Sequence, residues 1–426
     1  MRAQIPKLSS SLSKQLVGKS INTRQTGFAL LRELIVVLPG ALSNVIGKFI
    51  PATEASLRAT GVHHHHKTQT NSNLKIETLT FLRILLQSHE PTAIHPYLKR
   101  LVEPTVLAVK DKFYKITAEA LLVCEQLVRV ARPFVKMGNS FIVQPLPQPD
   151  FAQYIDTIYS TTMGRLTTDA DLEVKERAIT CLGAIIYQAG DVLDPKEVQG
   201  TVMKLLLDRL KNELTRLVSV KAIQHICESP LLEEGSGAGI AAQSISIHPI
   251  LGDVVLETAS FLRKSQRPLR VASLQALEAI IGRYANDMTP DLYLAVLTEL
   301  KPIFQDSDLH ILPLAMSTLC TLVSSTSAKG GAATPVLVVI RRDVLPDIGK
   351  LVWDSPHLVG VGIALDSLLN VWATVVKFGG NVVFKESVGL LVNPIHNSKQ
   401  TSGSSKLVCT GAYSWFRYNF LFTDFS

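Results

Sequence analysis

Cysteine is scarce in this sequence, and the few cysteines are far apart. No two of them stand in a CxxC pair or at the spacing of metal ligands, which excludes a disulfide framework and a cysteine-based zinc site. Most fall on the apolar faces of expected helices, where a free thiol acts as a small hydrophobe. The pattern predicts a reducing compartment, the cytoplasm or the nucleus. The cysteines are Cys124, Cys181, Cys227, Cys320 and Cys409.

Secretion signals and membrane spans are also missing. The N-terminal MRAQIPKLSS lacks the apolar core of a signal peptide, so secretion is not expected. Residues 358–376 are apolar except for Asp366 and a few small polar residues. A central aspartate costs about 2.5–3.5 kcal/mol in a bilayer. We therefore interpret this stretch as a buried repeat helix and expect no membrane partner.

Charge of one sign is not concentrated in this chain. The formal net charge is +7 over 426 residues, which is mild for such a length. Nucleic-acid binders carry a dense basic stripe with interleaved aromatic residues, and the sequence has none. We expect an acidic protein partner and no nucleic acid.

Two segments resemble phosphate-binding motifs but lack residues or flanking elements that such motifs need. The GKS at 18–20 imitates the end of a P-loop, but Ser13 stands where that loop needs a glycine. The GSGAG at 235–239 follows an acidic segment and no strand leads into it. Such a run fits a flexible linker better than a phosphate cradle. We predict no cofactor.

Candidate metal sites and catalytic residues are weak in the same way. The run His63–His66 is interpreted as an incidental loop insertion, because structural zinc ligands converge from separate positions. Asp169, Asp171 and Glu173 lack the glycine and the distal glutamate of an EF-hand and fit a helix N-terminus. Five further histidines have no paired acid or nucleophile, so we predict no metal site and no enzyme. They are His95, His225, His248, His310 and His357.

What the sequence does contain is a repeat. A basic residue is followed three positions later by a small residue and, four further on, by an aliphatic one. The repeat length is close to the roughly 40–47 residues of HEAT and armadillo repeats. The pattern occurs at Arg24/Gly27/Leu31, Lys75/Thr78/Leu82, Lys115/Ala118/Leu122, Lys175/Ala178/Leu182, Arg216/Ser219/Ile223 and Arg270/Ser273/Leu277, and more weakly at Ala315/Leu319 and Ala364/Leu368.

The repeat predicts an all-α fold, an α-solenoid (superhelix) of about eight HEAT/armadillo-type helical-pair repeats over residues 1–393. Each repeat should hold an outer helix A and an inner helix B. The small residue would let neighbouring helices approach, and the aliphatic residue would fill the groove. Helix A is expected at Pro39–Ile50, His95–Val109, Phe151–Leu166, Pro195–Lys211, Pro249–Leu262, Pro290–Phe304 and Val336–Val352.

Inserted loops account for the uneven repeat lengths, because insertions between repeats leave the stack intact. We expect them near 59–73, 134–150, 231–248 and 324–335. Residues 394–426 break the pattern and are rich in aromatic residues. We interpret them as an irregular, non-repeat tail produced by truncation or gene prediction.

Basic residues gather at two expected turns between helices A and B. Stacking would bring these turns together and form a basic ridge, with the first turn diluted by Asp208 and Glu213. Two interpretations stay open for such residues: solvated stems that cover apolar surface, or a row of charge that binds a partner. The candidate partner-binding residues are Arg209, Lys211, Arg216, Arg263, Lys264, Arg267 and Arg270.

Several segments resemble one protein family, in the same order, over about residues 5–393. They are LLRELIVVLPGAL (30–42), SNLKIETL (72–79), KFYKITAEALLVCEQLVRVARP (112–133), EVKERAITCLG (173–183), RLKNELTRLVSVKAI (209–223), ASFLRKSQRPLRVASLQALEAII (259–281) and DSDLHILPLAMSTL (306–319). The family is that of the cullin-associated, neddylation-dissociated (CAND) proteins.

The resemblance implies a long HEAT solenoid that wraps a cullin–RING scaffold whose cullin lacks its ubiquitin-like modifier. It further implies competition with the adaptor and substrate receptor, and so their exchange. Only the middle of that solenoid is resembled, since the family's N-terminal and C-terminal repeats have no counterpart. Lys112, where proline is expected in the family, is a local departure.

We therefore expect a non-catalytic, monomeric, protein-binding regulator of cullin–RING ubiquitin ligase (SCF) assembly, cytoplasmic and nuclear. It would bind unneddylated cullin with its RING protein and promote exchange of the adaptor and substrate receptor. The alternatives are a generic HEAT scaffold, a karyopherin-like transport solenoid, and a truncated fragment without independent activity.

Overall fold

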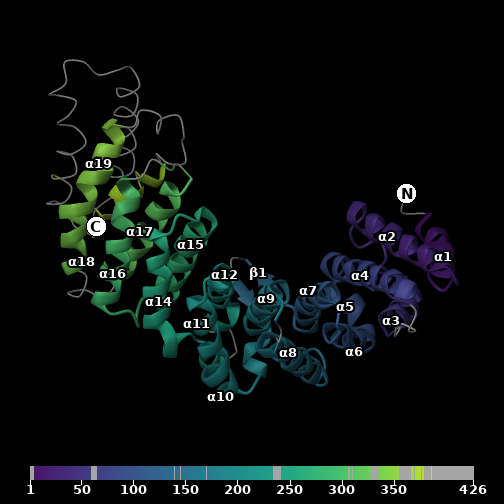
Figure 1. Ribbon diagram of the computed structural model, residues 1–426. Coiled ribbons are helices and arrows are strands. Elements are labelled where there is room, and N and C mark those ends of the chain that lie inside the picture. Colours follow the sequence, from purple (N-terminus) through teal and green to yellow (C-terminus); the bar gives the residue numbers. More distant parts are fainter. Residues whose placement is uncertain are drawn as a thin grey trace. The chain divides into compact units, whose positions relative to one another are not determined.

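The computed structural model describes residues 4–378 and 385, except 59–64, 139, 144, 169, 234–240, 306–307, 309, 328–333, 355–365, 369 and 376. The chain divides into two compact units, Met1–Ile247 and His248–Ser426. Each unit is described by itself. Helices make up nearly all of the regular structure in the described residues (Figure 1).

The described part of the first unit consists of helical pairs, each a helix A followed by a helix B. The pairs are α1 (Ile5–Leu16) with α2 (Ile21–Val37), α3 (Ile50–Arg58) with α4 (His65–Ser88), α6 (Leu98–Val109) with α7 (Tyr114–Ala131), α8 (Phe151–Thr168) with α9 (Leu172–Ala189), and α10 and α11 (Pro195–Glu197, Met203–Lys211) with α12 (Arg216–Cys227). Short elements between them are η2 (Ile46–Lys48), α5 (Pro91–Ile94), η3 (His95–Tyr97), η4 (Gly190–Val192), η5 (Val198–Val202), η6 (Pro230–Leu232) and α13 (Ala241–Ser244).

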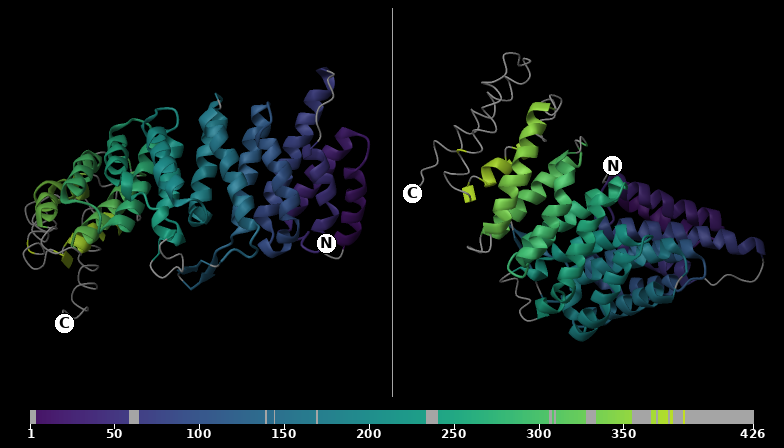
Figure 2. Two further views of the ribbon diagram at one scale, coloured as in Figure 1. Left: turned by 90° about the horizontal axis from the view of Figure 1, so that it is seen from below. Right: turned by 60° about the vertical axis from the view of Figure 1, so that its left-hand side comes forward.

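Stacking of like helices builds this unit. Helix α2 packs on α4, α4 on α7, α7 on α9 and α9 on α12, while α3 packs on α6 and α6 on α8. The B helices form the inner row of the unit and the A helices the outer row (Figure 1). Figure 2 shows these helices side by side in the order of the chain.

The second unit repeats the arrangement. Helix α14 packs on α16, and α15 on α17. The described residues between 366 and 378 are helical and bury Trp372 completely. The elements are η7 (His248–Ile250), α14 (Leu251–Ser260), η8 (Phe261–Arg263), α15 (Arg267–Tyr284), α16 (Pro290–Leu300), η9 (Lys301–Gln305), α17 (Leu312–Ser327), α18 (Thr334–Val339), η11 (Ile340–Val344) and α19 (Leu345–Asp354).

The predicted all-α solenoid of helical pairs is therefore confirmed. The recurring small residue is buried at every described position, namely Gly27, Thr78, Ala118, Ala178, Ser219, Ser273 and Ala315. The recurring aliphatic residue is also buried, except that Leu122 is half-buried. Each buried aliphatic side chain contributes roughly 1.5–3 kcal/mol of transfer free energy to folding. This burial explains the repeat pattern.

One expected helix A, Pro39–Ile50, is wrong. The chain forms turns there, Gly40 takes a positive φ of 75°, and α3 begins only at Ile50. Pro51 then occupies the first turn of α3, where the N–H that proline lacks would have no hydrogen-bond partner in the helix. The prediction of a helix that ends at Ile50 did not take Pro51 into account as a helix start. The remaining expected A helices lie where the pattern placed them.

The expected inserted loops are shorter than predicted at two places. Helix α4 already begins at His65, so residues 65–73 are helical, and α17 continues to Ser327. A helix nucleated by its buried part extends into polar sequence at little further cost. Part of the 59–73 insertion, including His63 and His64, lies outside the described residues, as do 328–333 and the tail 394–426.

The insertion near 134–150 contains an antiparallel hairpin of β1 (Val135–Met137) and β2 (Ser140–Ile142). It starts directly after Arg132, whose guanidinium forms a two-pronged ion pair with the Asp191 carboxylate. Both side chains are less than a tenth exposed. Losing one partner of such a buried pair typically costs about 3–5 kcal/mol. The pair therefore anchors the insertion to the next repeat.

Among the helices that the structure describes, none is both long and apolar enough to cross a membrane. Most of the apolar stretch 358–376 lies outside these residues.

Two helical glycines give a direct test of close helix packing. A Cβ on Gly183 would lie 2.9 Å from the Ala222 Cβ on α12, whereas a Cβ on Gly164 of α8 meets no atom within 4 Å. Gly183→Ala should lower the free energy of unfolding by about 1–3 kcal/mol. Gly164→Ala should raise it by roughly 0.5–1 kcal/mol, since alanine favours helix. Urea titrations followed by circular dichroism measure both, and a Gly183→Ala protein as stable as the wild type would contradict the packing.

Candidate protein-binding surface

The first predicted basic turn connects α11 to α12. Arg209 and Lys211 end α11, and Arg216 begins α12. The turn is built by the Asn212 side chain, which accepts a hydrogen bond from the Leu214 N–H at 3.0 Å. Lys211 is exposed, and Leu214 keeps 66% of its surface exposed. The turn therefore presents a cation next to an apolar side chain.

Arg209 has a structural contact in this turn. It is half-buried, and its Nη2 donates to the Leu166 carbonyl oxygen on α8 at 3.3 Å. Cations at a helix C-terminus are favourable because the last carbonyls carry partial negative charge. Arg209 thus joins two successive repeats and is less available to a partner than Lys211.

The second predicted basic turn connects η8 to α15. Arg263, Lys264 and Arg267 are all exposed there, and Arg270 is half-buried on α15. The Arg263 Nη2 donates to the Glu299 carboxylate at 2.6 Å, and Arg267 lies 3.5 Å from Asp308. Both acids belong to the next helical pair, so the two arginines are ion-paired, whereas Lys264 forms no ion pair with any residue that the structure describes.

Each basic turn is therefore confirmed as an exposed turn between helices A and B. They lie in different compact units, Met1–Ile247 and His248–Ser426. The continuous ridge across both turns, and the partner-binding role of its residues, remain predictions.

At two positions the recurring basic residue of the repeat bonds to the next repeat. The Lys75 Nζ donates to the Asp111 carboxylate at 3.0 Å, with side-chain exposures of 14% and 21%. The Arg24 Nη2 donates to the Ser56 hydroxyl at 2.8 Å. At these two positions the structure supports neither earlier interpretation, because the basic side chain is not simply solvated and its charged group is not free to bind a partner. The cation contributes to the contact between repeats.

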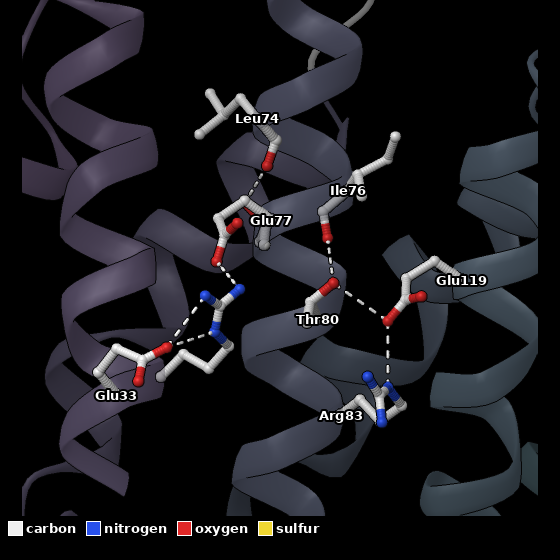
Figure 3. Close-up of polar contacts among 9 residues, drawn as sticks. Glu33, Leu74, Ile76, Glu77, Thr80, Arg83 and Glu119 are labelled. Carbon is white, nitrogen blue, oxygen red and sulfur yellow. Dashed lines mark hydrogen bonds and ion pairs between the residues drawn. The ribbon is translucent and has the colours of Figure 1, made fainter. Parts of the chain in front are cut away.

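A second set of polar contacts runs along the B helices. Arg32 on α2 donates to Glu77 on α4 at 2.6 Å, and Arg83 on α4 donates to Glu119 on α7 at 3.1 Å. Thr80 also donates to Glu119 (Figure 3). The paired residues are 45 and 36 positions apart in the sequence, about one repeat. These pairs were not predicted from the sequence. They could have been recognised from an acidic residue that follows a basic residue by about one repeat length.

Glu125 on α7 differs from the ion-paired glutamates of the B helices. One of its carboxylate oxygens is buried without a hydrogen-bond partner in the described structure. Burial raises the pKa of Glu125 from its usual 4.5 to about 7, and the charges of Arg177 and Arg83 oppose the shift. Water is removed from this carboxyl without full compensation. Its ionised form therefore destabilises the folded state.

Two cysteines and one histidine are buried by the packing of the helices. Burial raises the pKa of the Cys124 and Cys181 thiols well above the usual range, so both are unreactive at neutral pH. His225 stacks on Tyr187 with ring centroids 3.9 Å apart, and burial lowers the pKa of His225. No cluster of three or more histidine, cysteine, aspartate or glutamate side chains suited to a metal occurs among the described residues.

Comparison with known proteins gives a consistent picture. Residues 40–182 match the family described as CAND1-like, TPR repeats. Cullin-associated NEDD8-dissociated protein 1 of Arabidopsis thaliana is 36% identical over 95% of this chain. The protein of the same name from Drosophila melanogaster is 38% identical over 88% of it, and cullin-associated NEDD8-dissociated protein 2 of Mus musculus is 34% identical over 95%.

The chain spans 30%, 27% and 30% of the length of these three relatives. Among solved structures, karyopherin Kap121p bound to RanGTP matches 98% of this chain and 38% of its own, with a TM-score of 0.53 and 14% identity. Kap121p bound to the C-terminus of the phosphatase Cdc14p gives a TM-score of 0.54 at 12% identity over 98% of this chain and 46% of its own. At such identities the likeness concerns the solenoid fold alone.

Glu125 should make the stability of the protein depend on pH. Its carboxyl keeps a proton in the folded state up to about pH 7 but loses it near 4.5 when unfolded. Unfolding therefore releases a proton between these values, and stability falls as pH rises through them. Glu125→Gln should remove that fall and raise the free energy of unfolding at alkaline pH by on the order of 2–3 kcal/mol.

Urea titrations across this pH range measure the effect. Glu119→Gln is the matched control on the same helix, because Glu119 is ion-paired with Arg83 and its neutralisation should not stabilise the protein. Equal pH dependence in wild type and Glu125→Gln would contradict the assignment to Glu125.

Proposed function

We propose that this chain, a partial member of the cullin-associated NEDD8-dissociated protein family, is a non-catalytic regulator of cullin–RING ubiquitin ligase assembly. The observation that carries the proposal is the 36% identity with the Arabidopsis protein over 95% of this chain. The partner would be a cullin with its RING protein, in the form that lacks the ubiquitin-like modifier. Binding would promote exchange of the adaptor and substrate receptor.

The mechanism would be steric. A solenoid of stacked pairs offers one long surface, and many small contacts along it can hold a large partner. A competitor for the same cullin surface would then be excluded. No bond is made or broken in such a process, which agrees with the packed state of the buried cysteines and histidines. We further propose that the chain acts as a monomer, in the cytoplasm and nucleus.

Two lysines carry the most direct hypothesis for the contact. Lys211 and Lys264 are exposed at the two basic turns, and neither forms an ion pair with any residue that the structure describes. Exposed charges of this kind speed association with an acidic partner and add specificity. Arg263 and Arg267, which are ion-paired, and Arg209, which is bonded to a carbonyl oxygen, would contribute less. Arg216 and Arg270 are half-buried.

The test is capture of a purified cullin–RING complex by the immobilised chain, with the complex in its unmodified and its neddylated form. Selective capture of the unmodified form is expected. Lys211→Glu combined with Lys264→Glu should weaken capture by about fivefold or more, because it reverses two exposed charges. Neither substitution breaks an ion pair of the described residues, so the fold should be kept.

The matched control reverses two exposed lysines on A helices further from these turns, Lys99 and Lys196. It should bind like the wild type. Failure of a soluble, helical protein to capture either form would contradict the proposal and leave a generic scaffold or an inactive fragment. Equal loss with the control variant would show that net charge, not the basic turns, governs binding.

A further inference from the structure

The turn between α6 and α7 carries a surface that the proposed function does not use. Its sequence, KDKFYK at 110–115, places two aromatic residues among three lysines. Phe113 and Tyr114 each keep 37% of their surface exposed. Their rings meet edge to face with centroids 5.5 Å apart, and the Lys115 Nζ lies 5.9 Å from the Tyr114 ring centre.

The backbone of this turn is held rigidly by its neighbours. The Asp111 carboxylate accepts from the Phe113 N–H and from Lys75 Nζ, both at 3.0 Å. Its carbonyl oxygen accepts from Thr117 at 3.0 Å and from Arg165 Nη2 at 2.8 Å. A preformed turn loses little conformational freedom when a ligand binds, which favours binding.

Asp111 also leaves the lysines uncompensated. Its carboxylate is already paired with Lys75. Lys110, Lys112 and Lys115 are exposed, and none of the three has an acidic partner anywhere in the described part of the chain. The turn therefore combines exposed aromatic surface with three free positive charges.

An open hollow of about 450 Å³ adjoins the turn on the side of α8. Its lining residues are Lys110, Ser160, Thr161, Gly164, Arg165 and Thr168. Gly164 leaves space there, since a Cβ at this position would meet no atom within 4 Å. A hollow lined by a lysine, an arginine and several hydroxyl groups suits a short polar or acidic side chain.

We propose that the 110–115 turn and the adjoining hollow form a docking site for an acidic protein segment that also carries an aromatic or aliphatic residue. Carboxylates of the segment would contact Lys110, Lys112 and Lys115. An apolar side chain would lie on Phe113 and Tyr114, and a neighbouring acid would enter the hollow. Charge complementarity selects this partner, and the site does not depend on cullin binding.

Nucleic acid fits the same surface less well. Its backbone presents a continuous row of phosphates, so binders need an extended basic track. The positive patch here covers a single turn. The next turn along this edge, at the start of α9, exposes Leu172 and Glu173, and the acid would repel a phosphate chain. A short segment with mixed acidic and apolar side chains avoids that repulsion.

The test begins with a displayed library of random peptides of roughly 12 residues, selected on the full chain. Enriched peptides should be acidic and contain an aromatic or aliphatic residue. They are then synthesised with a fluorescent label, and their affinities are measured by anisotropy. Lys112→Glu combined with Lys115→Glu should weaken binding about tenfold. Gly164→Met fills the hollow and should weaken it about fivefold.

Two control variants match these changes elsewhere in the same unit. Lys196→Glu combined with Lys204→Glu reverses two other exposed lysines, and Gly200→Met alters another exposed helical glycine with open space around it. Both should bind within about twofold of wild type. The proposal is overturned if no acidic peptides are enriched, or if the enriched peptides bind the first two variants as tightly as the wild type. It is also overturned if a labelled oligonucleotide binds these residues more tightly than the peptides do.

Discussion

Burial of one apolar stripe of each B helix, against its own helix A and against the neighbouring B helices, is the interaction on which the rest of this structure depends. The stripe places a small residue and an aliphatic residue on the same face, so that backbones approach closely and the groove is filled. Ala178 and Leu182 are wholly buried on α9 in this way. Turns, polar contacts and exposed surfaces all take their positions from this stack.

Polar contacts between repeats fix how neighbouring helices are aligned in the stack. The Lys75–Asp111 and Arg83–Glu119 pairs each join one helical pair to the next, and Arg165 donates to the Val109 carbonyl oxygen at 2.7 Å. Apolar packing alone tolerates several alignments of two helices, whereas these bonds require one. Ion pairs between repeats also engage some of the basic residues, such as Lys75, Arg263 and Arg267. Lys211 and Lys264 at the basic turns stay exposed and form no ion pair with any residue that the structure describes.

The all-α solenoid and its repeat length could be predicted from the sequence. A pattern such as Lys115/Ala118/Leu122, which recurs about once in every 40 to 60 residues, reflects the burial of one face of helix B in each repeat. Helix starts were less predictable: Pro51 signalled the start of α3, but the apolar spacing before it suggested an earlier helix. The roles of the basic residues could not be predicted: Arg263 and Lys264 are neighbours, and among the described residues of the next repeat an acid pairs with Arg263 and none with Lys264. Such pairing depends on the rise of the stack, which no local pattern encodes.

The contacts spaced one repeat apart also have a mechanical consequence. A force that slides one helical pair past the next by a turn, about 5.4 Å, must break the polar contact at that interface, such as Arg32–Glu77 between α2 and α4 or Arg83–Glu119 between α4 and α7. A force that bends the stack changes each distance by a small amount and leaves every pair in place. Because each pair contacts only its neighbours, these small changes add along the chain. The first unit is therefore stiff against shear and compliant in bending, which are the properties of a leaf spring.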